Sequence, residues 1–241
     1  MNGILKALLT AGALAGACSA SAGETAFKGV SVDYGNASTN WVDGELVLTY
    51  TNAVIDSLIL GGAVKADVLA VGGGGAGGTG ASTSSTTSGN KGNGGDGGVV
   101  VETTCLLPAG TLEIVVGAGG TVTTTANANG TAGGDTTIES TEDSVAAIKA
   151  RGGAGGAGNV SMSLAKAGSP EQGVTSAIDG KTYGKGGAKY SGLTAKSGAP
   201  NTGNGGRVAG RIRLRLRVRA VTAAAASSSC GSRRRTTAWR A

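Results

Sequence analysis

Apolar residues recur at every second position in several short segments, and this pattern predicts β-strands. From Leu46 to Tyr50 the alternation places apolar side chains on one face of an extended segment. Residues 112–116 repeat the pattern after a Pro-Ala-Gly turn, and residues 99–104 form a further strand. Residues 68–71 are continuously apolar, which is typical of a strand buried on both faces. We therefore expect an all-β fold.

Glycine clusters follow the predicted strands directly. An apolar strand followed at once by a glycine cluster forms a unit that occurs three times, in residues 68–78, 112–120 and 145–158. One interpretation is a flexible linker, because glycine loses the most conformational entropy when it is ordered. The other is packed polyglycine II, an extended threefold helix whose peptide groups bond to neighbouring helices. A flexible linker would not be expected to recur after each strand. The alternation of strands and glycine clusters therefore favours the ordered helices.

A series of short motifs resembles a known family. An apolar strand enters residues 72–75, and the later motifs are Leu-Pro-Ala-Gly-Thr at 107–111, Val-Val-Gly-Ala-Gly-Gly at 115–120, Ser-Ala-Ile-Asp-Gly at 176–180, Tyr-Gly-Lys-Gly-Gly at 183–187 and Asn-Thr-Gly-Asn-Gly-Gly at 201–206. Their order resembles the glycine-rich domain of bacteria and phages, found in tail-fibre adhesins and in secreted bacterial proteins. The resemblance covers about residues 65–206, and residues 23–64 form an N-terminal β region before it.

The resemblance implies a fold and a way of binding. The fold is a β-sandwich whose sheets are interleaved with glycine-rich loops or polyglycine II helices. The implied role is structural or in recognition, and the family offers no catalytic residues. Phage adhesins expose variable loops between their glycine segments, so residues 79–91 and 121–129 are the expected binding loops.

The first 22 residues are typical of a secretory signal peptide. A short cationic start and an apolar run precede a small-x-small site that ends at Ala22, so we expect the mature chain to begin at Gly23. Lipid attachment at Cys18 is the alternative, and it alone would hold the chain on a membrane. A secreted, periplasmic or cell-surface location follows. Export argues against a phage tail protein, because those are assembled in the cytoplasm.

Composition excludes several kinds of site. Glycine contributes 47 residues and aromatic residues only 3%, so the core relies on aliphatic side chains. The absence of histidine excludes Ser-His-Asp triads and histidine-ligated zinc. The three cysteines, Cys18, Cys105 and Cys230, have no metal-ligand spacing. We expect no enzyme activity, no cofactor and no metal.

Three weaker motifs carry no function in this interpretation. Gly73, Gly75 and Gly78 have dinucleotide-binding spacing, but the Ser/Thr tract after them has no helical period. Residues 180–182 resemble the end of a phosphate loop that lacks its first glycine. The acidic residues Glu139, Glu142 and Asp143 are interpreted as a solvated turn rather than a calcium site.

The tail, residues 207–241, differs from the rest of the chain. It contains ten arginines and no acid, whereas residues 1–206 carry 11 basic and 15 acidic groups. With a suitable choice of third bases, residues 223–231 can be respelled in a shifted reading frame as a glycine run and an apolar closing strand, so we interpret the tail as out of frame and disordered. Taken at face value, arginines alternate with apolar residues in 211–219, which would form a strand that binds phosphate or anionic lipid.

These observations predict a non-enzymatic, secreted or surface-exposed structural or adhesive module. Its expected partner is a surface ligand, either a glycan or a protein, and no nucleic acid is expected because aromatic stacking residues are scarce. The alternatives are a carbohydrate-binding or ice-binding surface, which requires ranks of Thr and Asn on one flat face, and a fragment of a phage-derived tail-fibre adhesin.

Overall fold

The protein is all-β in every part that the structure describes. The structure is a computed structural model, and it describes residues 24–81, 91–121, 124–141, 148–161, 163–189, 202–205 and 214–220. The strands are β1 (Glu24–Phe27), β2 (Val30–Asp33), β3 (Ser38–Val42), β4 (Glu45–Tyr50), β5 (Ile55–Leu60), β6 (Val64–Val71), β7 (Val100–Leu107), β8 (Gly110–Val115), β9 (Thr136–Ser140), β10 (Ile148–Ala150), β11 (Val174–Thr175), β12 (Thr182–Tyr183) and β13 (Leu214–Ala220).

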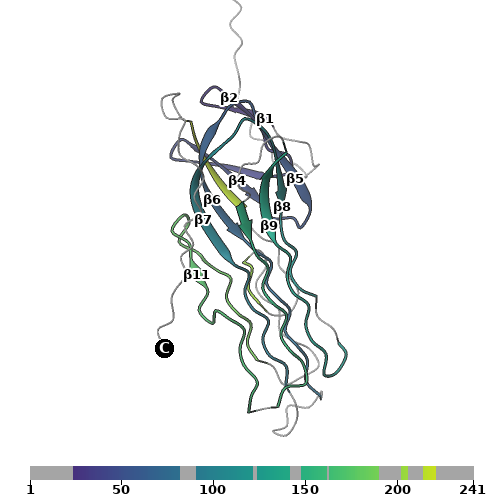
Figure 1. Cartoon of the computed structure of the whole chain (residues 1–241). Helices are drawn as coiled ribbons and strands as arrows, with labels where there is room; N and C mark the ends of the chain where they lie inside the picture. The colour runs from purple at the N-terminus through teal and green to yellow at the C-terminus, as the bar shows by residue number, and fades with distance from the viewer. Residues whose placement is uncertain are drawn as a thin grey trace, which may run out of the picture.

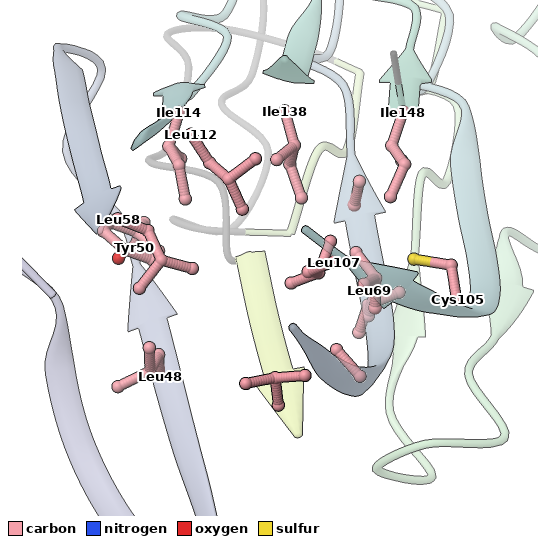
Figure 2. Packing of buried hydrophobic residues seen from close by; sticks show 14 of the residues in the cluster. Leu48, Tyr50, Leu58, Leu69, Cys105, Leu107, Leu112, Ile114, Ile138 and Ile148 are labelled. Carbon is pink, nitrogen blue, oxygen red and sulfur yellow. The ribbon is translucent and has the colours of Figure 1, made fainter. Parts of the chain in front are cut away.

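Two antiparallel sheets form a sandwich. One has the order β1-β2-β5-β8-β9-β10 and the other β3-β4-β13-β6-β7, while β11 and β12 pair separately. Both sheets contribute aliphatic side chains to one buried cluster (Figure 2). Leu48 and Leu69 come from the second sheet, and Leu58, Ile114 and Ile138 from the first. The predicted all-β sandwich is therefore confirmed.

The strands lie where the apolar patterns placed them, and the core follows from those patterns. Leu46, Leu48 and Tyr50 are all buried, as the alternation in β4 predicts. Val47 is buried as well, so β4 is covered on both faces at that point. Residues 68–71 of β6 have no exposed surface, which confirms the prediction of a strand buried on both faces.

The predicted boundary between residues 23–64 and 65–206 is wrong. β5 precedes this boundary, yet it pairs along its whole length with β8, from Ile55 opposite Val115 to Leu60 opposite Gly110. The side chains of Phe27 and Val32 belong to the same cluster as those of β6 and β8. The N-terminal strands are therefore part of the sandwich, because each sheet is assembled from both sides of the boundary.

The predicted disorder of the arginine-rich tail is wrong for Leu214–Ala220. These residues form β13, which lies between β4 and β6 and pairs with both. Leu216 is opposite Leu48 and Val68, and Arg215 is opposite Thr49 and Leu69, so both sides of β13 are paired. Residues 206–213 and 221–241 lie outside the described residues, and the frame shift stays a hypothesis about the gene.

Glycine-rich rods leave the sandwich at one end and run side by side (Figure 1). We call a rod each extended segment that bonds to its neighbours through the backbone. They are rod A (72–80), rod B (91–99), rod C (116–121), rod D (128–135), rod E (151–159), rod F (165–170) and rod G (184–188).

The hydrogen bonds between rods repeat every three residues. Rod A donates to rod B from Gly72, Gly75 and Gly78, and the acceptors are the carbonyls of Val99, Asp96 and Asn93, at 2.8–3.0 Å. It donates to rod D with the same spacing, from Gly73, Ala76 and Thr79 to Gly134, Thr131 and Ala128, at 2.9 Å. This is the pattern of polyglycine II, which has three residues per turn and bonds between chains. The predicted ordered helices are confirmed, and the linker interpretation is wrong.

Rod A lies at the centre of the bundle, and its contacts explain the glycines. All of its residues are buried. A Cβ added to Gly75 would lie 1.9 Å from the carbonyl oxygen of Ala154 in rod E. A Cβ on Gly95 in rod B would lie 2.2 Å from the Gly75 carbonyl oxygen. Neither obstacle is a movable side chain, so a larger residue would force two backbones apart.

We expect Gly75→Ala to destabilise the protein by about 3 kcal/mol, because the added methyl group overlaps a backbone carbonyl. Urea denaturation of the purified protein measures the change. Gly62→Ala is the matched control, since the nearest atom to its added Cβ is Val30 Cγ2 at 3.5 Å, an ordinary contact. We expect this control to stay within about 0.5 kcal/mol of the wild type. Equal effects of the two substitutions would contradict the close packing of rod A.

Candidate functional site: the turns at the rod ends

Three turns lie at the end of the rod bundle that is far from the sandwich. Rods A, C and E follow β6, β8 and β10 and run away from the sheets, and rods B, D and F return (Figure 1). The described parts of the three connections, residues 80–81 with 91, 121 with 124–128, and 159–161 with 163–165, therefore lie together at one end. Asn159 N–H donates to Thr79 O, and Lys91 and Val160 exchange backbone hydrogen bonds, which ties the rod ends together. We call this region the tip.

Thr79 anchors the tip from inside. Its side chain is fully buried, and its Oγ1 donates to the Thr125 carbonyl oxygen at 2.6 Å. The same oxygen accepts a hydrogen bond from Ala128 N–H at 2.9 Å. The neighbouring Gly80 carbonyl accepts from Asn127 N–H at 3.2 Å. One hydroxyl group at the end of rod A therefore fixes the turn between rods C and D.

The described surface of the tip consists mainly of small polar side chains. Thr124, Asn127 and Ser161 are exposed, and Leu164 is 66% exposed. Asn127 has a φ of 57°, in the left-handed region that asparagine tolerates in turns. Residues 124–128 form a turn, so they do not make the flat, regular rank of Thr and Asn that an ice-binding face requires. The available chemistry is hydrogen bonding by hydroxyl and amide groups.

Both predicted binding loops lie at the tip, as far as the structure describes them. Residues 82–90 and 122–123 lie outside the described residues. The position of Thr79 was predicted wrongly, since it is a buried anchor rather than part of an exposed loop. The third turn, residues 159–165, was missed by sequence reasoning. The signal for it was present, because the third unit of strand and glycines ends at Gly158 and is followed by Asn-Val-Ser.

Asparagine and aspartate side chains fasten the outer rods. In rod B, Asn93 Oδ1 accepts from Lys166 N–H at 3.0 Å and Asp96 Oδ1 accepts from Ser169 N–H at 2.8 Å, and both donors lie in rod F. Rod D repeats the arrangement toward rod E: Asn129 accepts from Gly158 N–H and Asp135 from Gly152 N–H, each at 2.8 Å. Each of these side-chain oxygens accepts a hydrogen bond from a backbone N–H of the neighbouring rod, as backbone carbonyl oxygens do elsewhere between rods. Sequence reasoning missed this role, although the spacing of three or six residues was visible.

Asp135 has an additional partner on β10. Lys149 Nζ lies 2.6 Å from Asp135 Oδ2, and this hydrogen bond, followed by that from Gly152 N–H, lowers the pKa of the Asp135 carboxyl below its ordinary value. A lowered pKa means that the charged carboxylate stabilises the fold above its unfolded-state pKa. This contribution is lost as the pH falls through the lower folded-state pKa. Both side chains are largely solvated, so the contribution is small.

The other residues singled out in the sequence do not join the tip. Glu139 lies exposed on β9, and Glu142 and Asp143 lie outside the described residues, as do Cys18, Ala22, Gly23 and Cys230. Cys105 is buried in β7. In the described parts of the chain, no three His, Cys, Asp or Glu residues form a group able to hold a metal ion. No helix of sufficient length and hydrophobicity to cross a bilayer occurs in the same residues.

We expect Thr79→Val to destabilise the protein by about 1–3 kcal/mol, because valine keeps the volume and leaves Ala128 N–H without its acceptor. The loss should be local, with faster hydrogen exchange at Ala128 and Asn127 than in the sandwich. Thr79→Ser retains the hydroxyl group and serves as the control. Urea denaturation and amide exchange measure both effects. A valine variant as stable and as protected as the serine variant would show that the hydroxyl group does not anchor the turn.

Comparison with known families agrees with the arrangement of sandwich and rods. The family model described as a glycine-rich domain matches residues 51–237. This match begins before the predicted 65–206 region and continues through β13 into the tail. No curated protein matches the chain. Because the family model spans most of the sequence, the chain belongs to the glycine-rich domain family.

Proposed function

We propose that this protein is a non-enzymatic, exported module that binds a surface ligand through the turns at its tip. The sandwich is the base, and the rods hold the turns away from it. The observation that carries the proposal is the three-residue hydrogen-bond repeat, because it turns glycine-rich chain into an ordered support. Loops held by a rigid scaffold are the common location of binding residues.

The tip combines a fixed backbone with exposed polar groups. Thr79 is buried and fixes the turn at residues 124–128, whereas Thr124 and Asn127 in that turn are exposed. A ligand that meets such a surface is recognised by hydrogen bonds to hydroxyl and amide groups, with Leu164 as an apolar contact. Glycans and protein loops both supply these complementary groups. We therefore propose that the ligand is a glycan or a protein loop.

Substitutions at the tip should reduce binding without unfolding the protein. The tip variant carries Thr124→Ala, Asn127→Gly and Leu164→Ala, in which glycine preserves the left-handed backbone at residue 127. We expect its affinity to fall by about tenfold or more for any ligand that the mature wild type binds on a glycan array or on protein-coated wells.

The control variant carries Thr39→Ala and Asn40→Ala on β3, where both side chains are exposed on the sandwich. We expect it to bind as the wild type does. Loss of binding in the β3 variant together with full binding by the tip variant would move the ligand to the sandwich and contradict the proposal.

Export is part of the proposal and has its own measurement. N-terminal sequencing of protein recovered from the medium, periplasm or cell surface should begin at Gly23. Cys18→Ser should leave the amount and location of the exported protein unchanged. A chain that retains Met1 and stays inside the cell, or one that is released from membranes by Cys18→Ser, would contradict signal cleavage after Ala22.

A further inference from the structure

The tip and the three rods that lead out to it contain no acidic residue. Three stretches of chain run out to the tip and most of the way back, residues 72–95, 116–134 and 152–170, and none includes Asp or Glu. Asp96 and Asp135 come directly after the first two stretches, where rods B and D approach the sheets (Figure 1). None of the residues that build the tip therefore brings a negative charge.

Two lysines flank the third turn of the tip. Lys91 begins rod B, and its backbone N–H donates to Val160 O at 2.7 Å while Val160 N–H donates back to Lys91 O at 2.8 Å. Lys166 lies in rod F just after the turn, and its N–H donates to Asn93 Oδ1 at 3.0 Å. Within the described residues, neither lysine forms an ion pair with a carboxylate. The backbone thus fixes the positions of two positive charges that remain available to a ligand.

The same turn brings hydroxyl groups to the two lysines. Lys166 is bonded to Asn93, which lies two residues after Lys91 in rod B. Because a threefold extended helix rises about 3.1 Å per residue, the two lysine backbones are offset by only about 6 Å along the rods. Ser161 and Ser163 in the turn are both exposed, and their hydroxyl oxygens are 3.4 Å apart. Two ammonium and two hydroxyl groups therefore belong to one turn and its flanks.

The residue types near the tip favour an acidic glycan over other ligands. Protein interfaces concentrate their binding energy in aromatic residues and arginine, and neither occurs in residues 72–95, 116–134 or 152–170. A neutral sugar gains only neutral hydrogen bonds, which largely replace those that the same groups make with water. An anionic group on a sugar adds hydrogen bonds to the lysines that are about twice as strong.

We propose that the tip binds an acidic glycan. Lys91 and Lys166 contact its carboxylate or phosphate groups, and Ser161 and Ser163 contact its hydroxyl groups. This inference rests on the proposed function of the tip and narrows the ligand to saccharides that carry negative charge. The lack of acidic residues serves the same end, because neighbouring carboxylates would repel such a ligand and slow its approach.

Amide chemical shifts of the purified protein locate the binding of matched trisaccharides. The probes are trigalacturonate, which carries carboxylates, a phosphorylated maltotriose, and neutral maltotriose. We expect an acidic probe to shift the amides of Ser161, Ser163 and Lys166 and to bind about tenfold more tightly than maltotriose. The acidic probe that binds more tightly identifies the anionic group. Equal binding of maltotriose, or no shift at these amides with either acidic probe, would overturn the proposal.

A lysine variant tests the charges directly. It carries Lys91→Gln and Lys166→Gln, which keep the backbone hydrogen bonds and remove two positive charges. We expect its affinity for the acidic probe to fall by about tenfold or more, with an unchanged Tm.

The matched control carries Lys65→Gln and Lys181→Gln, two exposed lysines on β6 and between β11 and β12. It loses the same net charge, and we expect its affinity to stay within about twofold of the wild type. The arginine-rich tail is identical in both variants, so its attraction for anions cancels in the comparison. An equal loss of affinity in both variants would assign the binding to net charge and overturn the proposal.

The acidic-glycan proposal and the proposed function fail in different ways. Binding that the tip variant loses and the lysine variant retains would leave the tip as the binding site and overturn the acidic glycan. Triglutamate supplies carboxylates without a sugar. Shifts of the tip amides by triglutamate as large as those by the acidic trisaccharides would indicate an acidic protein loop instead and overturn the proposal as well.

Discussion

The fold depends on hydrogen bonds between backbones that approach without side chains between them. In each three-residue turn of rod A, one residue donates toward rod B and the next toward rod D, while carbonyls of the same rod accept from rod E. Each such contact requires that nothing larger than hydrogen project into it, as the distances around Gly75 and Gly95 show. The high glycine content is thus a packing requirement. It replaces the large aromatic side chains that this chain largely lacks.

The sandwich makes this bundle possible by setting the spacing of the rods at their starting points. β6 ends where rod A begins, and rod B leads into β7, which is the partner of β6 along eight residue pairs. Strand pairing therefore brings two rods together before their own hydrogen bonds begin. Glycine loses more conformational entropy on ordering than any other residue. The alignment of the rods by a conventional hydrophobic core therefore matters for the stability of the whole protein.

Local patterns in the sequence predicted the local structure well. Alternation identified β4 and β8, continuous apolarity identified β6, and the return of glycine after each strand identified ordered rods. Pairing between distant strands was not predictable in this way, because no local pattern states that β5 lies beside β8. The tail was misjudged because its arginines appeared foreign to the family, although its period of two is that of a strand. At the tip, the burial of Thr79 depends on partners about 46 residues further along the chain.

The threefold repeat of the rods also limits how the length of this protein can change. An insertion of three residues adds one full turn, lengthens a rod by about 9 Å and returns every face to its former neighbour. One extra residue rotates all later positions by about a third of a turn, which directs side chains such as Asn93 and Asp96 into spaces that only glycine fits. Relatives of this protein should therefore differ in rod length by multiples of three, while the turns between rods accept insertions of any length.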